Sequence, residues 1–167
     1  MSLSRVSTPC IGVCSTTYGD TVCRGCTRFL HEIVDWNRYT NEQKTLVWQR
    51  LDLLLRTVVS NYAEIIDAEL FQQMLRFQNI RHQPQLSPLG WVPELFKAAG
   101  NKPLDWASYG LRIDHRYANT APRTLYDQIS ADVHALAVAH YDRNHRVPQT
   151  RLADLLANIS LTEPEML

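Results

Sequence analysis

Four cysteines near the N-terminus are the residues whose type and spacing point most directly to chemistry. They form two close pairs, Cys10-x3-Cys14 and Cys23-x2-Cys26, and the rest of the 167-residue chain contains no cysteine. A soft metal cation prefers deprotonated sulfur ligands, and two pairs joined by a short loop can bring four of them to one centre. We therefore expect Cys10, Cys14, Cys23 and Cys26 to bind one metal centre as thiolates.

The spacing leaves the identity of the metal centre open. Structural zinc sites use gaps of two to four residues within a pair, and iron–sulfur signatures vary more widely, so one zinc ion or one iron–sulfur cluster fits. A redox dithiol is the third alternative, since Cys23-Arg24-Gly25-Cys26 alone has the Cys-x-x-Cys pattern. A thioredoxin-like site would follow a strand in a βαβ unit, and no such pattern precedes Cys23.

Charged and aromatic residues beside the cysteines suggest how the site is supported. Arg24 and Arg28 flank the second pair, and we expect them to offset the negative charge of four thiolates. His31 follows closely, but with four thiolates available we expect it not to be a ligand. Trp36 continues an apolar stripe that begins at Phe29, so we expect it to be buried and to cover the metal site.

Other polar and aromatic residues nearby are expected to have ordinary structural roles. Trp48 is expected in the core, whereas Glu32 and Glu42 are expected to be solvated residues on helix surfaces. Three further histidines, His134, His140 and His145, look like a ligand set. On one helix, however, His134 and His140 point about 120° apart, and His145 lies about 16 Å from His134. One helix cannot bring all three to a single metal ion.

The segment from about residue 8 to residue 56 resembles a known family. The motifs that carry the resemblance are Pro9-Cys10-x-Gly12-x-Cys14, Cys23-Arg24-Gly25-Cys26-x-Arg28, Glu32-Ile33-x-x-Trp36, Glu42 and Trp48-x-Arg50-Leu51. Together they resemble short bacterial proteins grouped as domain of unknown function 1289, commonly labelled predicted iron–sulfur proteins. The resemblance implies that the four cysteines and a helical hairpin behind them form one unit, and it brings a cluster level with zinc. Tyr39 stands where the family more usually has Met, and residues 81–167 resemble no family.

The apolar pattern predicts a mainly α fold. A short helix is expected around Phe29 to Trp36. A capping-box pattern at Thr40 to Gln43 predicts the start of a long helix. We expect this helix to break near Ser60-Asn61, with the apolar pattern extending to about Ile80. Residues 81–120 are rich in proline and glycine, with a short helix expected at 93–99. We then expect a helix with Thr120 as its N-cap and a last helix over 150–158, with Leu152, Leu155, Leu156 and Ile159 facing inward. This pattern divides the chain into a cysteine-rich module with a helical hairpin (residues 1–56) and a helical region (57–167) packed on it.

Composition narrows the function classes. The chain has 17 basic and 17 acidic residues, so binding of nucleic acid or membranes through overall positive charge is excluded. No signal-peptide core, membrane span or standard catalytic signature is visible, so we expect a cytoplasmic, non-enzymatic interaction or accessory protein with a protein partner. One alternative is a single-cluster electron-transfer or redox-sensing protein. Another is a small nucleic-acid-binding regulator, because residues 141–158 loosely resemble a helix–turn–helix edge with Arg143, Arg146 and Arg151 facing phosphate.

Overall fold

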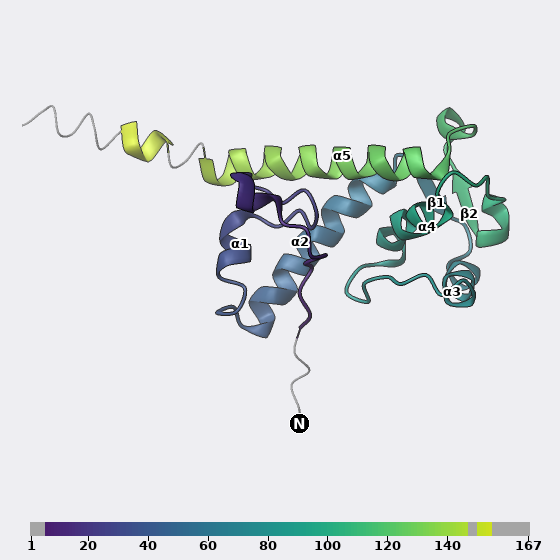
Figure 1. Ribbon diagram of the computed structural model, residues 1–167, viewed down its shortest axis with the longest axis horizontal. Helices are drawn as coiled ribbons and strands as arrows, with labels where there is room; N and C mark the ends of the chain where they lie inside the picture. The colour runs from purple at the N-terminus through teal and green to yellow at the C-terminus, as the bar shows by residue number, and fades with distance from the viewer. Residues whose placement is uncertain (1–5, 147–149, 155–167) are drawn as a thin grey trace, which may run out of the picture.

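The expected mainly α fold is confirmed. A computed structural model describes residues 6–146 and 150–154 of the chain. Its main elements are, in chain order, α1 (Leu30–Val34), α2 (Asn41–Val59), β1 (Ala63–Ile65), α3 (Ala68–Phe77), α4 (Val92–Ala99), β2 (Leu111–Ile113) and α5 (Pro122–Tyr141). Figure 1 shows α2 crossing beneath the long α5, with the cysteine-bearing loop and α1 near one end of this pair and α3, α4 and the strands near the other.

Helix α2 begins where the capping box predicts. The hydroxyl of Thr40 accepts a hydrogen bond from the Gln43 backbone N–H, and the Gln43 side chain accepts one from the Thr40 N–H. The helix ends at Val59, at the break expected near Ser60-Asn61, so the apolar pattern that continues to Ile80 belongs to later elements. The expected boundary between residues 1–56 and residues 57–167 falls inside α2, because residues 56 and 57 both belong to that helix. Helix α2 also packs on α5.

A two-stranded antiparallel sheet pairs β1, which lies between α2 and α3, with β2, which precedes α5, and the sequence pattern did not indicate it. Ala63 pairs with Ile113 and Ile65 pairs with Leu111. Three-residue strands are too short to show the alternation that marks a strand, and the partners are far apart in the sequence. Gly110 precedes β2 with a φ of 67°, and a Cβ there would lie 2.4 Å from the Asp67 carbonyl oxygen, so the turn requires glycine.

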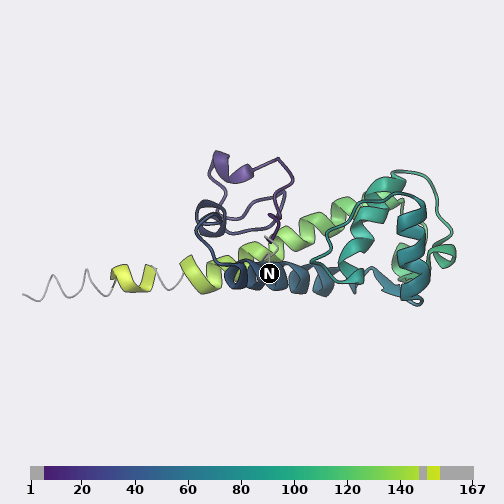
Figure 2. The ribbon, with the colours of Figure 1, turned by 90° about the horizontal axis from the view of Figure 1, so that it is seen from below.

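The largest hydrophobic core lies where α4 and α5 pack against α3 and the strands. Phe71, Leu75, Phe96, Leu125 and Ile129 are almost completely buried there. Proline in the first turn and Gly100 after the last turn bound α4, as predicted. Figure 2 shows α3, α4 and the strands near one end of α5 and the cysteine-bearing loop beside its other part.

The start of α5 corrects one prediction. Its N-cap is Ala121 and not Thr120, and Pro122 is the first helical residue. The residue before a proline is driven toward extended backbone, and Ala121 has that conformation (φ −62°, ψ 142°). The helix therefore begins at the proline itself, one position later than a threonine cap would place it.

The far end of α5 reaches the cysteine-bearing loop. Ala137 of α5 is fully buried in a small cluster with Val22, Phe29 and Leu54, and a π-helical turn, Asp142–Arg146, continues the helix. Leu152, expected to face inward, is 58% exposed; Leu155, Leu156 and Ile159 lie outside the described residues. Within residues 6–146 and 150–154, no helix has the length and apolar character needed to cross a membrane.

Candidate metal centre

The second cysteine pair sits on a tight turn that is anchored to the helices. Val22 and Phe29 form an antiparallel bridge, the Cys23 N–H donates to the Arg28 carbonyl, and the Thr27 N–H donates back to the Cys23 carbonyl. The imidazole of His134 on α5 lies 3.2 Å from the Val22 carbonyl oxygen. The chain from Cys23 to Cys26 is thus held as a hairpin end between α2 and α5.

Backbone amides surround the sulfur of Cys23. Burial by itself raises the pKa of this thiol, but hydrogen bonds from the backbone N–H groups of Cys26, Ser15 and Gly25 outweigh burial and lower the pKa to about 7. The turn therefore stabilises a thiolate at Cys23, the form in which cysteine binds a metal. For Cys26, burial raises the thiol pKa, and a hydrogen bond from Arg28 opposes this effect.

The first cysteine pair crosses over the second. The Cys23 thiol lies 3.7 Å from the Val13 carbonyl oxygen. A Cβ on Gly25 would lie 2.6 Å from the same oxygen, so this close crossing needs glycine inside the Cys23–Cys26 turn. Both pairs therefore belong to one compact loop, although the sequence separates them by eight residues.

The four sulfurs do not converge on one point in this arrangement. Cys10 is exposed and its sulfur accepts a hydrogen bond from the Gly12 N–H at 3.4 Å, while the Cys14 sulfur lies 2.9 Å from the Thr16 hydroxyl. All four cysteines are free, and among residues 6–146 and 150–154 no three His, Cys, Asp or Glu side chains are placed to hold one metal ion. The donor set and the crossing of the pairs fit a thiolate centre, and four-sulfur ligation stays a prediction.

Of the two arginines expected to offset thiolate charge, only Arg28 has a contact with a thiol. It is 3% exposed, and its Nε donates to the Cys26 sulfur at 3.4 Å. Its guanidinium stacks on Trp36 at 4.9 Å from the ring centroid, and Lys44 approaches the same ring at 5.8 Å. Arg24 instead points outward and pairs with Asp20. Lys44 was not singled out in the sequence, because nothing in the helical pattern shows that its side chain folds back toward the loop.

Trp36 and Trp48 are buried, as expected, and Trp48 donates its indole N–H to the Ser7 carbonyl at 2.9 Å. Glu32 contradicts the expectation of a solvated residue, since it is 6% exposed. Its carboxylate accepts from the Phe29 N–H and forms an ion pair with Arg50. A charged side chain is buried here because two donors from separate elements satisfy it, which only the folded structure could show. Glu42 is exposed, as expected.

The histidines are dispersed. His31 packs its ring against His145 at a centroid distance of 4.9 Å, His134 contacts Val22, and His140 is exposed. As expected from the helical geometry, His134, His140 and His145 do not gather at one point. The sequence did not indicate the pairing of His31 with His145, which joins α1 to the π-helical turn.

Residues 8–54 match the model of a family described as "Protein of unknown function (DUF1289)". The match spans the cysteine-bearing loop, α1 and most of α2, and it confirms the resemblance carried by the cysteine and tryptophan motifs. No curated protein and no solved structure matches the chain. This family is itself of unknown function, so the match identifies the cysteine-rich segment without assigning its activity.

Proposed function

We propose that Cys10, Cys14, Cys23 and Cys26 bind one metal centre as thiolates, and that the protein is a non-enzymatic interaction or accessory module built around it. The crossing of the two pairs carries this proposal. Val13 of the first pair touches the Cys23–Cys26 turn so closely that only glycine fits at position 25. A short loop gains this arrangement at the cost of ordering its backbone, and a shared metal centre would offset that cost.

The surrounding residues have defined roles in this proposal. The N–H groups of Ser15, Gly25 and Cys26 stabilise negative charge at Cys23, and Arg28 does so at Cys26. Trp36 holds Arg28 in place and excludes water from its guanidinium. A bound zinc ion would supply folding free energy to the loop, whereas a bound iron–sulfur cluster would supply one-electron redox chemistry.

The outer surface of the loop supports a protein partner. Val13 and Tyr18 are 70% and 91% exposed, and they lie on the same loop as the exposed Cys10. Apolar side chains grouped beside a site favour contact with another protein. The exposure of Cys10 also favours the second candidate, electron transfer or redox sensing, because electrons pass most readily where a cluster ligand reaches the surface.

The test is to purify the protein without oxygen, record its absorption spectrum and measure zinc, iron and acid-labile sulfide. We expect about one zinc per chain without visible absorption, or iron with sulfide and a broad visible band. Zinc would favour the interaction module, and a cluster would favour the redox candidate. Absence of both metals from protein expressed in medium supplemented with each would refute the proposal.

A further inference from the structure

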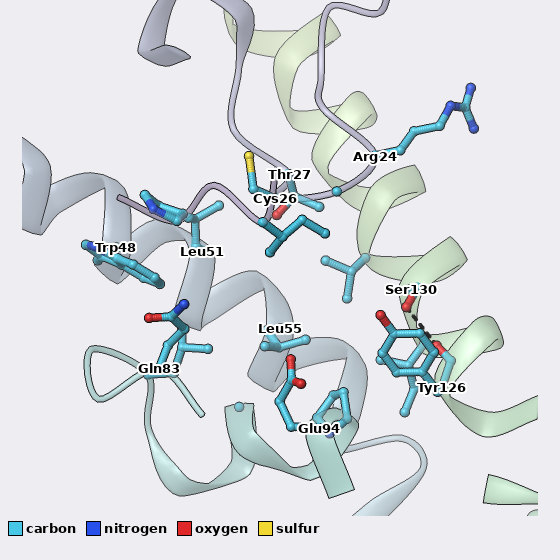
Figure 3. Close-up of a pocket in the computed structure, with 18 residues that line it drawn as sticks. Arg24, Cys26, Thr27, Trp48, Leu51, Leu55, Gln83, Glu94, Tyr126 and Ser130 are labelled. Carbon is cyan, nitrogen blue, oxygen red and sulfur yellow. Dashed lines mark hydrogen bonds between the residues drawn. The ribbon is translucent and has the colours of Figure 1, made fainter. Parts of the chain in front are cut away.

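A cavity lies where the cysteine-bearing loop meets α2, α4 and α5. Its volume is about 170 Å³, and most of its lining is apolar. Ile11 comes from the loop, Leu55 from α2, Pro93 from α4, and Ile129 and Val133 from α5. Figure 3 shows Leu55, Glu94 and Tyr126 around the space below Cys26, and this space is only partly enclosed. Because the walls come from four separate elements, the cavity exists only in the folded chain.

The size of the cavity limits what it can hold. An apolar cavity of about 150 Å³ binds a molecule the size of benzene. A compact body of six or seven carbon atoms therefore fits within this space. The apolar walls favour a ring or branched hydrocarbon over a sugar or a phosphate.

One acidic side chain gives the cavity a polar end. Glu94 lines it from the first turn of α4 and is half-buried. Within residues 6–146 and 150–154 its carboxylate has no hydrogen bond and no ion pair, and Figure 3 shows it directed toward Leu55. A carboxylate beside an apolar wall gains most from a cation that it can hydrogen-bond.

The other charged residue at the cavity does not compensate Glu94. Arg24 lies at the opposite end, extends away from the cavity in Figure 3, and pairs with Asp20. The cavity thus combines apolar walls with a single available negative charge.

We propose that this cavity binds a small organic cation, a primary amine with a compact apolar body about the size of benzylamine, with its ammonium group against Glu94. Since Cys26 also lines the cavity, the bound amine would contact the turn that carries the second cysteine pair. Glu94, which would hold the ammonium group, is not one of the proposed metal ligands. The test of this proposal therefore does not depend on the identity of the metal.

The experiment is a titration of the full chain with benzylamine at neutral pH, followed by amide chemical shifts and calorimetry. Benzyl alcohol has the same shape without the charge and is the matched ligand control. We expect benzylamine to bind at least about tenfold more tightly than benzyl alcohol, with shifts at α4, α5 and the Cys26 turn.

Two matched variants sharpen the result. Glu94→Gln should bring the two affinities within about twofold of each other, because the amide keeps the shape but loses the charge. Glu42→Gln removes the corresponding first-turn carboxylate of α2, which is exposed and outside the cavity, and should leave the preference unchanged.

Failure of the wild-type protein to bind either ligand, equal affinity for both, or a charge preference that persists in a folded Glu94→Gln variant would overturn the proposal. A result against the cavity leaves the metal proposal intact, because metal content is measured separately. Amide chemical-shift changes confined to surfaces outside the cavity would likewise refute the cavity proposal.

Discussion

The cysteine-bearing loop and the core around α4 and α5 are stabilised in different ways. The core buries large side chains such as Phe71, Phe96 and Leu125 completely. The loop buries few side chains to a similar degree, among them Val22, Cys23, Arg28 and Phe29, and it leaves Ile11, Val13 and Tyr18 exposed. Its order comes from hydrogen bonds, glycine turns and contacts with α2 and α5. Hydrophobic burial therefore dominates in one region, whereas polar contacts and turns dominate in the other.

The largest expected effect is at the second cysteine pair. Replacing both Cys23 and Cys26 with Ser should abolish metal binding, because half of the proposed ligands are removed. The loop should lose hydrogen-exchange protection at residues 22–29, while amides of α4 keep theirs. Metal analysis and exchange mass spectrometry on the full chain measure both.

Arg24→Gln is the control for this double variant, since Arg24 lies within the same turn but contacts no thiol. It should retain metal and protection. If the double serine variant retained one metal per chain, the metal would not depend on Cys23 and Cys26, and the proposed metal contribution to the loop would be refuted.

Removing a large side chain from the core around α4 and α5 should lower the stability of the protein. Phe96→Ala should lower the free energy of unfolding by about 3–5 kcal/mol, because Phe96 is fully buried and packs edge-on against Trp106. Urea unfolding measures the change. Phe77→Ala removes the same ring from a position that is 77% exposed and should change stability by less than about 0.5 kcal/mol. Equal effects of the two variants would contradict the assignment of the core.

A smaller effect is expected at the junction between the loop and α2. Arg28→Gln should destabilise the protein by about 1–3 kcal/mol, because the Cys26 sulfur loses its donor and Trp36 loses its stacked cation. Thermal unfolding and metal content are the measurements. The matched Arg24→Gln variant should stay within about 0.5 kcal/mol of the wild type, so indistinguishable arginine variants would count against a supporting role for Arg28.

The smallest effect concerns pH at the contact of α1 with the π-helical turn. Burial, then the neighbouring charge of His31, lowers the pKa of His145, with Arg50 adding to this and Glu32 opposing it. A lowered pKa means that the unfolded chain binds the proton more tightly. Stability from this contact is therefore present above the ordinary histidine pKa of about 6.5 and is lost as pH falls below it.

Replacing His145 with Phe should reduce the fall in Tm between pH 7.5 and pH 5.5, because the ring packing is kept and the titrating group is removed. His140→Phe, at an exposed position on α5, is the control. An unchanged pH dependence in His145→Phe would show that this contact does not titrate as proposed.

Local patterns were sufficient to predict much of the helical structure. The Thr40–Gln43 capping box, the apolar spacing of α2 and the proline and glycine that bound α4 depend on neighbours within a few residues, so the sequence shows them directly. The cysteine pairs were visible for the same reason, since only three and two residues separate the members of each pair. The N-cap of α5 was misplaced by one residue because the restriction imposed by Pro122 on Ala121 outweighed the capping tendency of Thr120.

Local patterns were thus enough to predict the main helices, the cysteine pairs and the segment at residues 8–54 that matches the family model. The folded arrangement was needed to show that Val13 packs against Gly25, that Glu32 is buried against Arg50, that Arg28 and not Arg24 reaches a thiol, and that Glu94 faces a cavity. Each of these depends on residues that are distant in the chain and adjacent in space. Their burial and their partners depend on how whole elements pack together, and periodicity and spacing in the sequence do not reveal this packing.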